Sequence, residues 1–166
     1  MRIRDADHGD LPAIDQIYHH YVACSTCTMQ TEPGTPAERL AWFQAHDPEH
    51  PVVVATDGED IVAWASLSRY HPRAGYAPTV EDSIYVRHDR RGLGVGRLLL
   101  AELLARGARA GHHSILAVIA ADQAASVRLH EAAGFARVGR LREVGFKLGR
   151  WIDVDLLQRT LPAPRS

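Results

Sequence analysis

Hydrophobic and polar positions along the first part of the chain recur with the period of helices. Between Asp10 and Tyr21 the apolar side chains return every three or four residues, which predicts a helix with one buried face. Residues 22–33 have no such period and are rich in Ser and Thr, so we expect a loop. Thr35-Pro36-Ala37-Glu38 predicts the start of a second helix, because Thr can cap it, Pro suits its first position and Glu completes a capping box.

Shorter apolar and alternating runs predict strands. After a short strand at residues 2–4, the runs 51–56 and 61–68 flank Asp57-Gly58, the turn signal of a β-hairpin. A loop with Pro and Gly follows over residues 70–78, and residues 79–86 form the next strand.

The second half of the chain repeats the alternation of helix and strand. We expect helices from Arg97 onward and over residues 124–133, and strands at 114–121, 135–141 and 152–157. This order predicts an α+β fold, mixed α/β, with one mixed central sheet. We expect a single domain over residues 1–166, of which 162–166 form a frayed tail.

Composition excludes several function classes. The chain has 166 residues and a formal net charge of −1, which gives no electrostatic reason to expect a nucleic-acid or membrane partner. No apolar run approaches the roughly 20 residues that span a bilayer. The polar N-terminus is unlike a signal peptide, so we expect a cytoplasmic protein.

Two cysteines, Cys24 and Cys27, form one CxxC pair. A zinc site would need a second pair of ligands, and a thioredoxin-like site would need another context. We interpret them as buried or half-buried thiols and expect no metal.

The stretch from Ser83 to Leu104 carries the clearest chemistry. A strand ends near Val86, and Gly92, Gly94 and Gly96 then precede a helix. Glycines allow consecutive backbone N–H groups to face one anion, and the start of a helix adds unpaired N–H donors. The order strand, glycine loop and helix therefore predicts an anion site, although a loop of this kind can also bind nothing.

The spacing of these glycines narrows the choice of anion. No Lys-Ser or Lys-Thr follows them, as a P-loop requires, and the third glycine of a dinucleotide fingerprint is missing. Arg91-Gly92-Leu93-Gly94-Val95-Gly96 does fit R/Q-x-x-G-x-G/A, and so resembles the pyrophosphate loop of the GCN5-related N-acetyltransferases.

Further blocks strengthen this resemblance. Residues 126–135 are similar to a second acetyltransferase signature, S-x-x-x-Y/H-x-x-x-G-F. Ser25-Thr26, residues 79–86 and residues 141–153 resemble the phosphinothricin and methionine sulfoximine N-acetyltransferase subfamily. The resemblance implies a sheet with helices on both faces and a splay between two parallel strands. It also implies acetyl transfer from acetyl-CoA to the amine of a small amino acid, by a homodimer.

The resemblance assigns a set of residues to the cofactor. The strand residues would run beside the pantetheine arm and the glycine loop would surround the pyrophosphate, while Gln123 stands where the family usually has Asn. The implied contacts are Ile84, Tyr85, Val86, Arg91, Gly92, Leu93, Gly94, Val95, Gly96, Arg97, Gln123 and Ser126.

Two residues stand at catalytic positions of the family. Glu81 would take a proton from the substrate ammonium, since only a free amine has the lone pair that attacks a thioester. His130, where many acetyltransferases have Tyr, would protonate the departing thiolate. A backbone N–H near Val86 could stabilise the oxyanion. Without the resemblance, a solvated or ion-paired carboxylate would be the favoured interpretation of Glu81, and His130 could be an ordinary, partly exposed helix histidine.

The substrate end departs from the subfamily. Tyr70-His71-Pro72-Arg73 replaces the usual aromatic-Arg-x-Arg, and Met29 replaces an aromatic residue. Arg73 alone could still bind an anionic group. The expected substrate contacts are His71, Pro72, Arg73, Glu81, Asp82 and Ser83, and Lys147, Gly149, Arg150 and Trp151 would shape the far wall. Acetylation of another small amine or of a protein N-terminus, and a CoA-binding sensor without turnover, remain alternatives.

Overall fold

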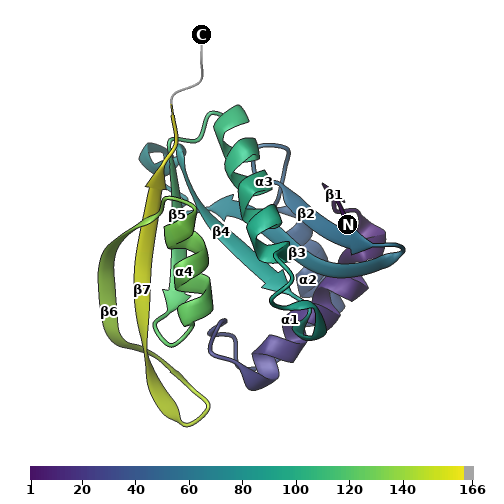
Figure 1. Ribbon diagram of the computed structural model, residues 1–166, viewed down its shortest axis with the longest axis horizontal. Coiled ribbons are helices and arrows are strands. Elements are labelled where there is room, and N and C mark those ends of the chain that lie inside the picture. Colours follow the sequence, from purple (N-terminus) through teal and green to yellow (C-terminus); the bar gives the residue numbers. More distant parts are fainter. Residues whose placement is uncertain (163–166) are drawn as a thin grey trace.

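The computed structural model describes residues 1–162. Its centre is a seven-stranded sheet with the order β1-β2-β3-β4-β5-β7-β6 (Figure 1). All neighbouring strands are antiparallel except β4 and β5. The strands are β1 (Arg2–Asp5), β2 (Val52–Asp57), β3 (Asp60–Arg69), β4 (Thr79–Val86), β5 (Ser114–Ala120), β6 (Ala136–Lys147) and β7 (Arg150–Thr160).

Helices cover both faces of this sheet. One face packs against α1 (Leu11–Cys24) and α2 (Pro36–Gln44), and the other against α3 (Val95–Arg109) and α4 (Ala124–Ala132) (Figure 1). The sequence thus predicted the fold class, the order of the elements and the single mixed sheet correctly.

A core lies on each side of the sheet. Leu99, Leu100 and Leu103 of α3 pack on apolar side chains of β3, β4 and β5 and are almost fully buried. On the other face, Ile14 and Ile17 of α1 pack near Trp64 of β3. Burial of large apolar side chains on both faces holds the central strands in place, so the strand ends can present polar groups to a ligand.

The parallel pair β4–β5 is joined only at one end. Thr79, Val80 and Glu81 pair with Ser114, Ile115 and Leu116, and the pairing stops there. Beyond Glu81 the two strands separate, as Figure 1 shows. The splay expected from the family resemblance is therefore present.

Element boundaries differ from the prediction at three places. Helix α1 continues to Cys24, three residues beyond Tyr21, and α3 begins at Val95, two residues before Arg97. Strands β6 and β7 are much longer than the predicted 135–141 and 152–157. They form one long hairpin whose register shifts near Gly139 and before Gly145, and these irregularities hide the alternating pattern. Of the tail expected at 162–166, residues 163–166 lie outside the described residues.

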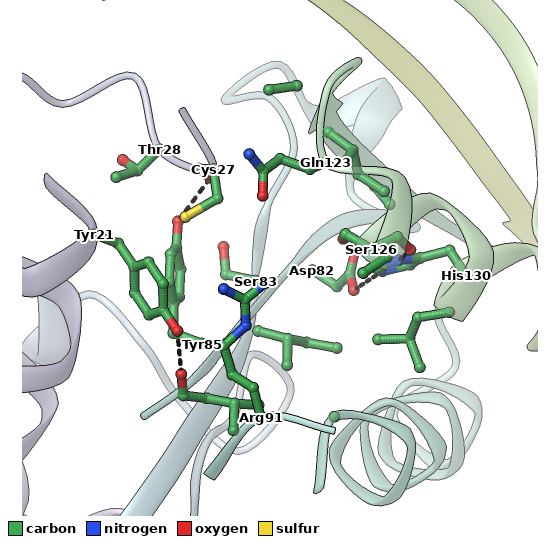
Figure 2. Close-up of a pocket in the computed structure, with 18 of the residues that line it drawn as sticks. Tyr21, Cys27, Thr28, Asp82, Ser83, Tyr85, Arg91, Gln123, Ser126 and His130 are labelled. Atoms are coloured by element: carbon green, nitrogen blue, oxygen red, sulfur yellow. Dashed lines mark hydrogen bonds and ion pairs between the residues drawn. The ribbon is translucent and has the colours of Figure 1, made fainter. Parts of the chain in front are cut away.

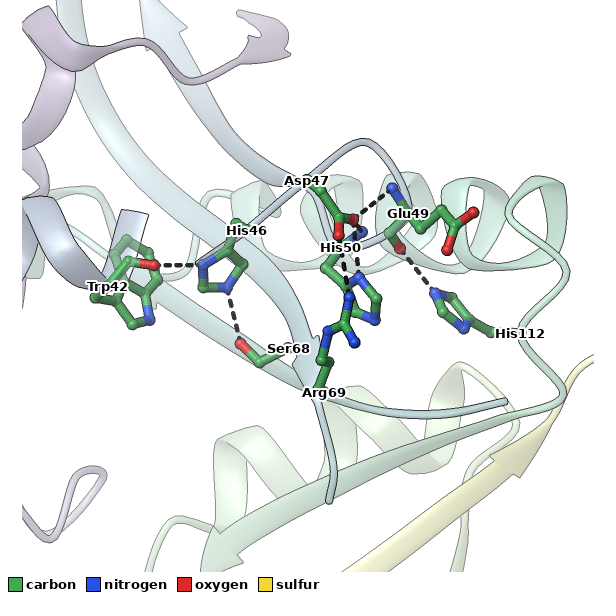
Figure 3. Close-up of polar contacts among 8 residues, drawn as sticks. All are labelled: Trp42, His46, Asp47, Glu49, His50, Ser68, Arg69 and His112. Atoms are coloured by element: carbon green, nitrogen blue, oxygen red, sulfur yellow. Dashed lines mark hydrogen bonds and ion pairs between the residues drawn. The ribbon is translucent and has the colours of Figure 1, made fainter. Parts of the chain in front are cut away.

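A polar cluster of histidines lies between α2, β3 and the turn after α3, away from the splayed strands (Figure 3). The Asp47 carboxylate accepts a hydrogen bond from the backbone N–H of His50 at 2.8 Å. The ring Nδ1 of His50 also lies 2.8 Å from the same carboxylate oxygen. His112 Nε2 donates to the Glu49 carbonyl at 2.7 Å. The cluster joins the segment before β2 to the end of α3. No helix among residues 1–162 is long and apolar enough to cross a membrane.

Candidate active site

A cleft of about 570 Å³ opens where β4 and β5 separate (Figure 2). Its walls come from the second half of both strands, the start of α3, one side of α4 and the segment between α1 and α2. All the expected cofactor contacts except Leu93 line it, and so do Glu81, Asp82, Ser83 and His130. The fold thus gathers residues from these five parts of the chain around one opening.

The glycine loop has the backbone that the anion site requires. Gly92 and Gly94 adopt φ angles of 77° and 81°, in the left-handed region that side chains disfavour. Gly94 is the N-cap of α3, so the first-turn N–H groups of this helix are free at the cleft wall. Arg91 and Arg97 also line the cleft and add positive charge. Leu93, by contrast, is 63% exposed and turned away.

Gly96 differs from the other two glycines of the loop. Its φ is not positive, and a Cβ there would meet Leu129 at 3.4 Å and Val86 at 3.8 Å. These are ordinary van der Waals contacts, so the requirement for glycine in this loop rests on Gly92 and Gly94.

Strand β4 presents unpaired backbone to the cleft. From Asp82 to Val86 its edge toward β5 has no strand partner, although its other edge pairs fully with β3. The hydroxyl of Tyr21 donates a hydrogen bond to the Val86 carbonyl (Figure 2). The remaining amide and carbonyl groups match the needs of an extended molecule that carries its own amides.

Glu81 lies at the last paired position of β4, beside the opening. It is half-buried, and among residues 1–162 its carboxylate has no ion-pair or hydrogen-bond partner. Burial, and secondly the charge of neighbouring Asp82, raise its pKa above the ordinary value for Glu. An unpaired carboxylate with a raised pKa suits a general base better than a structural ion pair.

His130 and Asp82 form a buried pair on the α3–α4 face of the sheet. His130 Nε2 lies 2.8 Å from Asp82 Oδ2, and Nδ1 donates to the Ser126 carbonyl at 2.8 Å (Figure 2). Burial alone would lower the pKa of His130, but the hydrogen bond and the charge of Asp82 outweigh it, so the pKa is raised. Both ring nitrogens are engaged within the protein, and neither is free to donate to a thiolate in this arrangement.

A scan against protein-family models matches residues 14–135 to the acetyltransferase (GNAT) family. The chain belongs to this family. A methionine sulfoximine/methionine sulfone acetyltransferase of Pseudomonas paraeruginosa is 40% identical over 99% of this chain and 96% of its own length. The phosphinothricin N-acetyltransferase of Streptomyces coelicolor is 39% identical over 97% of this chain and 96% of its own length.

A solved structure shows the same fold with its co-substrate. The phosphinothricin acetyltransferase of Sinorhizobium meliloti in complex with acetyl-CoA superposes with a TM-score of 0.93 at 35% identity. The match covers 99% of this chain and 93% of that one. These comparisons confirm the family resemblance, the fold and the class of enzyme: the chain is an N-acetyltransferase.

In this acetyltransferase, a polar network connects the α1–α2 segment to the end of β5. Thr26 Oγ1 donates to Asp122 at 2.7 Å and accepts from Gln123 Nε2 at 2.8 Å, while Arg150 pairs with Asp122 from the β7 side. The Gln123 amide nitrogen is thereby used within the protein. Its carbonyl oxygen accepts no hydrogen bond from the described residues and is available to the ligand in the cleft.

The expected substrate loop lies elsewhere. This loop, residues 71–73, belongs to the connection before β4, at the end of the strand opposite Val86. Its residues do not line the cleft. Arg73 is exposed, and its backbone N–H donates to His71 Nδ1 at 3.1 Å. Their role in binding substrate stays a prediction.

In the part of the cleft wall that precedes α2, the sequence pointed to Thr26 and Met29 but not to Tyr21, Cys27 and Thr28, which line the cleft beside them. Lys147, expected in the far wall, does not line the cleft and lies behind this segment. Its buried ammonium donates to the carbonyls of Thr28 at 2.8 Å and Tyr21 at 3.3 Å, and burial lowers its pKa. Lys147 is the only lysine of the sequence, and this was the available signal. No group of three or more His, Cys, Asp or Glu side chains within residues 1–162 is arranged to hold a metal ion.

Proposed function

We propose that this acetyltransferase moves the acetyl group of acetyl-CoA to the α-amine of a small amino acid of the methionine sulfone, methionine sulfoximine or phosphinothricin kind. The observation that carries the proposal is the unpaired, half-buried carboxylate of Glu81 beside a cleft lined by the glycine loop. The names of the full-length relatives support the substrate class.

The cleft suits acetyl-CoA in each of its parts. Gly92 to Arg97 would bind the pyrophosphate through backbone N–H groups and the two arginines. The open edge of β4 from Asp82 to Val86 would pair with the amides of the pantetheine arm. The thioester would then lie near the point where β4 and β5 part, next to Glu81.

Glu81 would accept a proton from the substrate ammonium, directly or through a water molecule. The free amine would attack the thioester carbon, and an unpaired backbone N–H on the open edge of β4 close to Glu81, rather than one near Val86, would stabilise the oxyanion. When the carbon–sulfur bond breaks, the second proton on the new amide nitrogen is available to the thiolate. His130 is then a positioning residue that holds Asp82, rather than the acid expected from the sequence.

We also propose that the enzyme is a homodimer that uses the β6–β7 hairpin. Strand β6 is an edge of the sheet, and several of the large apolar side chains on and around this hairpin are about half exposed: Val138, Leu141, Val144, Phe146, Leu148 and Trp151. Such a patch on an edge strand suits a second copy of the chain. The cytoplasmic location expected from the sequence stays a prediction.

One assay tests the proposal. Purified enzyme is mixed with acetyl-CoA and a panel of amines, and release of free CoA is followed with a thiol reagent. We expect turnover with methionine sulfone or phosphinothricin and little with peptides that have free N-termini. Efficient acetylation of the peptides alone would contradict the proposed substrate class. Binding of acetyl-CoA without release of free CoA for any amine would favour a CoA-binding sensor without turnover.

A further inference from the structure

A second cavity of about 340 Å³ adjoins the cleft, on the sheet face that α1 and α2 cover. Ser83 and Tyr85 line both cavities, so the two are neighbours along β4. Side chains two residues apart on a strand share a face, which places Glu81 on the same side as Ser83, roughly 7 Å along the strand. A substrate with its amine at Glu81 therefore has its side chain within reach of the second cavity.

Four aromatic rings form one wall of this cavity, and the rest of its lining is mostly polar. Trp64 stacks on Tyr85 with ring centroids 4.8 Å apart, and Tyr18 meets Tyr85 edge-on at 5.0 Å. The ring of Trp42 meets that of Trp64 edge-on, with ring centroids 5.5 Å apart. Because these rings brace one another, the wall is rigid and apolar, and it suits a methyl or methylene group.

One cation enters this aromatic wall. The guanidinium carbon of Arg39 lies 4.7 Å from the ring centroid of Trp42 and 4.9 Å from that of Tyr18. Its Nε donates to Asp15 at 2.5 Å, so its charge is balanced. The Arg39 side chain is only 11% exposed and lines the cavity.

Two side chains of this wall have N–H groups without an acceptor. Within the described part of the chain, neither terminal nitrogen of Arg39 donates a hydrogen bond to a protein acceptor, and the buried indole N–H of Trp64 has no acceptor either. A guanidinium presents its N–H groups in a plane, which matches two oxygens on one atom. Since Asp15 already neutralises Arg39, the missing acceptor need not carry a full negative charge.

We propose that this second cavity binds the end of the substrate side chain, where Arg39 donates to oxygens on sulfur or phosphorus and the aromatic rings contact the methyl group. The inference rests on the proposed function, because it assumes an amino-acid acceptor with its amine at Glu81. It also gives the chain a binding group for such oxygens that does not depend on the loop at His71 and Arg73, which lines neither cavity.

The test compares two acceptors that differ only in their oxygens, methionine sulfone and methionine. In Arg39→Met, the loss of charged hydrogen bonds should lower kcat/KM for the sulfone by about ten- to a hundredfold. Activity with methionine, and KM for acetyl-CoA, should change by no more than about threefold. Arg39→Lys should lie between, because it keeps the charge and loses the planar donors. Arg109→Met, an exposed arginine on α3, is the matched control.

A direct binding measurement separates this inference from the proposed function. Trp42 and Trp64 lie in the wall, so methionine sulfone should change the tryptophan fluorescence of the enzyme with CoA bound, and Arg39→Met should weaken that titration. Circular dichroism melts confirm that the variant is folded; if it is not, the Arg39→Lys titration decides. An equal loss for both acceptors, or an unchanged sulfone titration in a folded variant, would overturn the inference. Binding without turnover by the parent enzyme would overturn the proposed function and leave the subsite supported.

Discussion

The imidazole Nε2 of His130 lies 2.8 Å from the carboxylate Oδ2 of Asp82, and both side chains are buried beside the cleft. The pair joins α4 to β4 across the splay, since His130 belongs to α4, Asp82 belongs to β4 and both line the opening. The other ring nitrogen of His130, Nδ1, donates a hydrogen bond to the Ser126 carbonyl, so the ring is held in one orientation. The pair fixes one wall of the cleft relative to the other.

The His130–Asp82 pair predicts a dependence of stability on pH. Because the pKa of His130 is raised in the folded state, its stabilising effect is fully present below the unfolded pKa of about 6.5 and is lost as pH rises through the folded pKa. His130→Ala leaves Asp82 buried without a partner and should cost about 3 kcal/mol below pH 6. Thermal melts from about pH 6 to about pH 9 should show a gap between parent and variant that narrows with rising pH. A constant gap would contradict a charged pair.

Glu81→Gln keeps the size of the side chain and removes its basicity. We expect kcat to fall by roughly 10²- to 10⁴-fold with little change in acetyl-CoA affinity. In the parent enzyme, activity should fall on the acid side through a pKa above the ordinary value for Glu, because the carboxylate must be ionised to accept the proton. Glu59→Gln, on the exposed turn between β2 and β3, is the control. Activity within a few-fold of the parent from about pH 6 to pH 9 would exclude Glu81 as the base.

Gly94→Ala should weaken acetyl-CoA binding, because a Cβ at a φ of 81° is strained and the N-cap would shift. Isothermal titration of acetyl-CoA measures the effect. Gly58→Ala is a matched control, since Gly58 has a φ of 63° and open space around it in the β2–β3 turn. Both variants should lose some stability, of order 1 kcal/mol, but only Gly94→Ala should lose affinity. Equal affinities would contradict the anion site.

Asp47 should control stability at acid pH (Figure 3). Burial alone would raise its pKa, but hydrogen bonds from His50 and Arg69 lower it to about 2. The stabilising effect is therefore present above the unfolded pKa near 3.8 and is lost as pH falls through the folded value. Asp47→Asn should lower Tm at neutral pH and match the parent near pH 2. An unchanged Tm at neutral pH would show that the cluster does not stabilise the fold.

The sequence predicted those parts of the site that local chemistry determines. The left-handed Gly92 and Gly94 follow from the spacing of the loop, and the position of Glu81 follows from the family resemblance. Contacts between distant segments could not be predicted in this way. Asp82 and His130 are 48 residues apart, and Lys147 reaches Thr28 across 119 residues, so only the folded sheet brings them together.

The second cavity, which Arg39 and Trp64 line, could not be predicted for the same reason. In the sequence, the position of Arg39 predicts an ordinary exposed residue on a capped helix, and that of Trp64 predicts a core residue of a strand. Their meeting depends on how α2 crosses β3, which no pattern within either segment specifies. The length of the β6–β7 hairpin was also missed, because Glu143 takes a left-handed conformation inside a strand and breaks the alternation.

The separation of β4 from β5 has a consequence for the protein before it meets a ligand. Exposed strand edges normally invite other chains to pair with them and aggregate, and proteins protect them at the rim of a sheet. Here the open edge lies in the interior of the sheet, flanked by α4 and the start of α3, where only a thin and flexible molecule can enter. The backbone amides of β4 on this side should therefore exchange with deuterium in the free enzyme and become protected when acetyl-CoA takes the place of the missing strand.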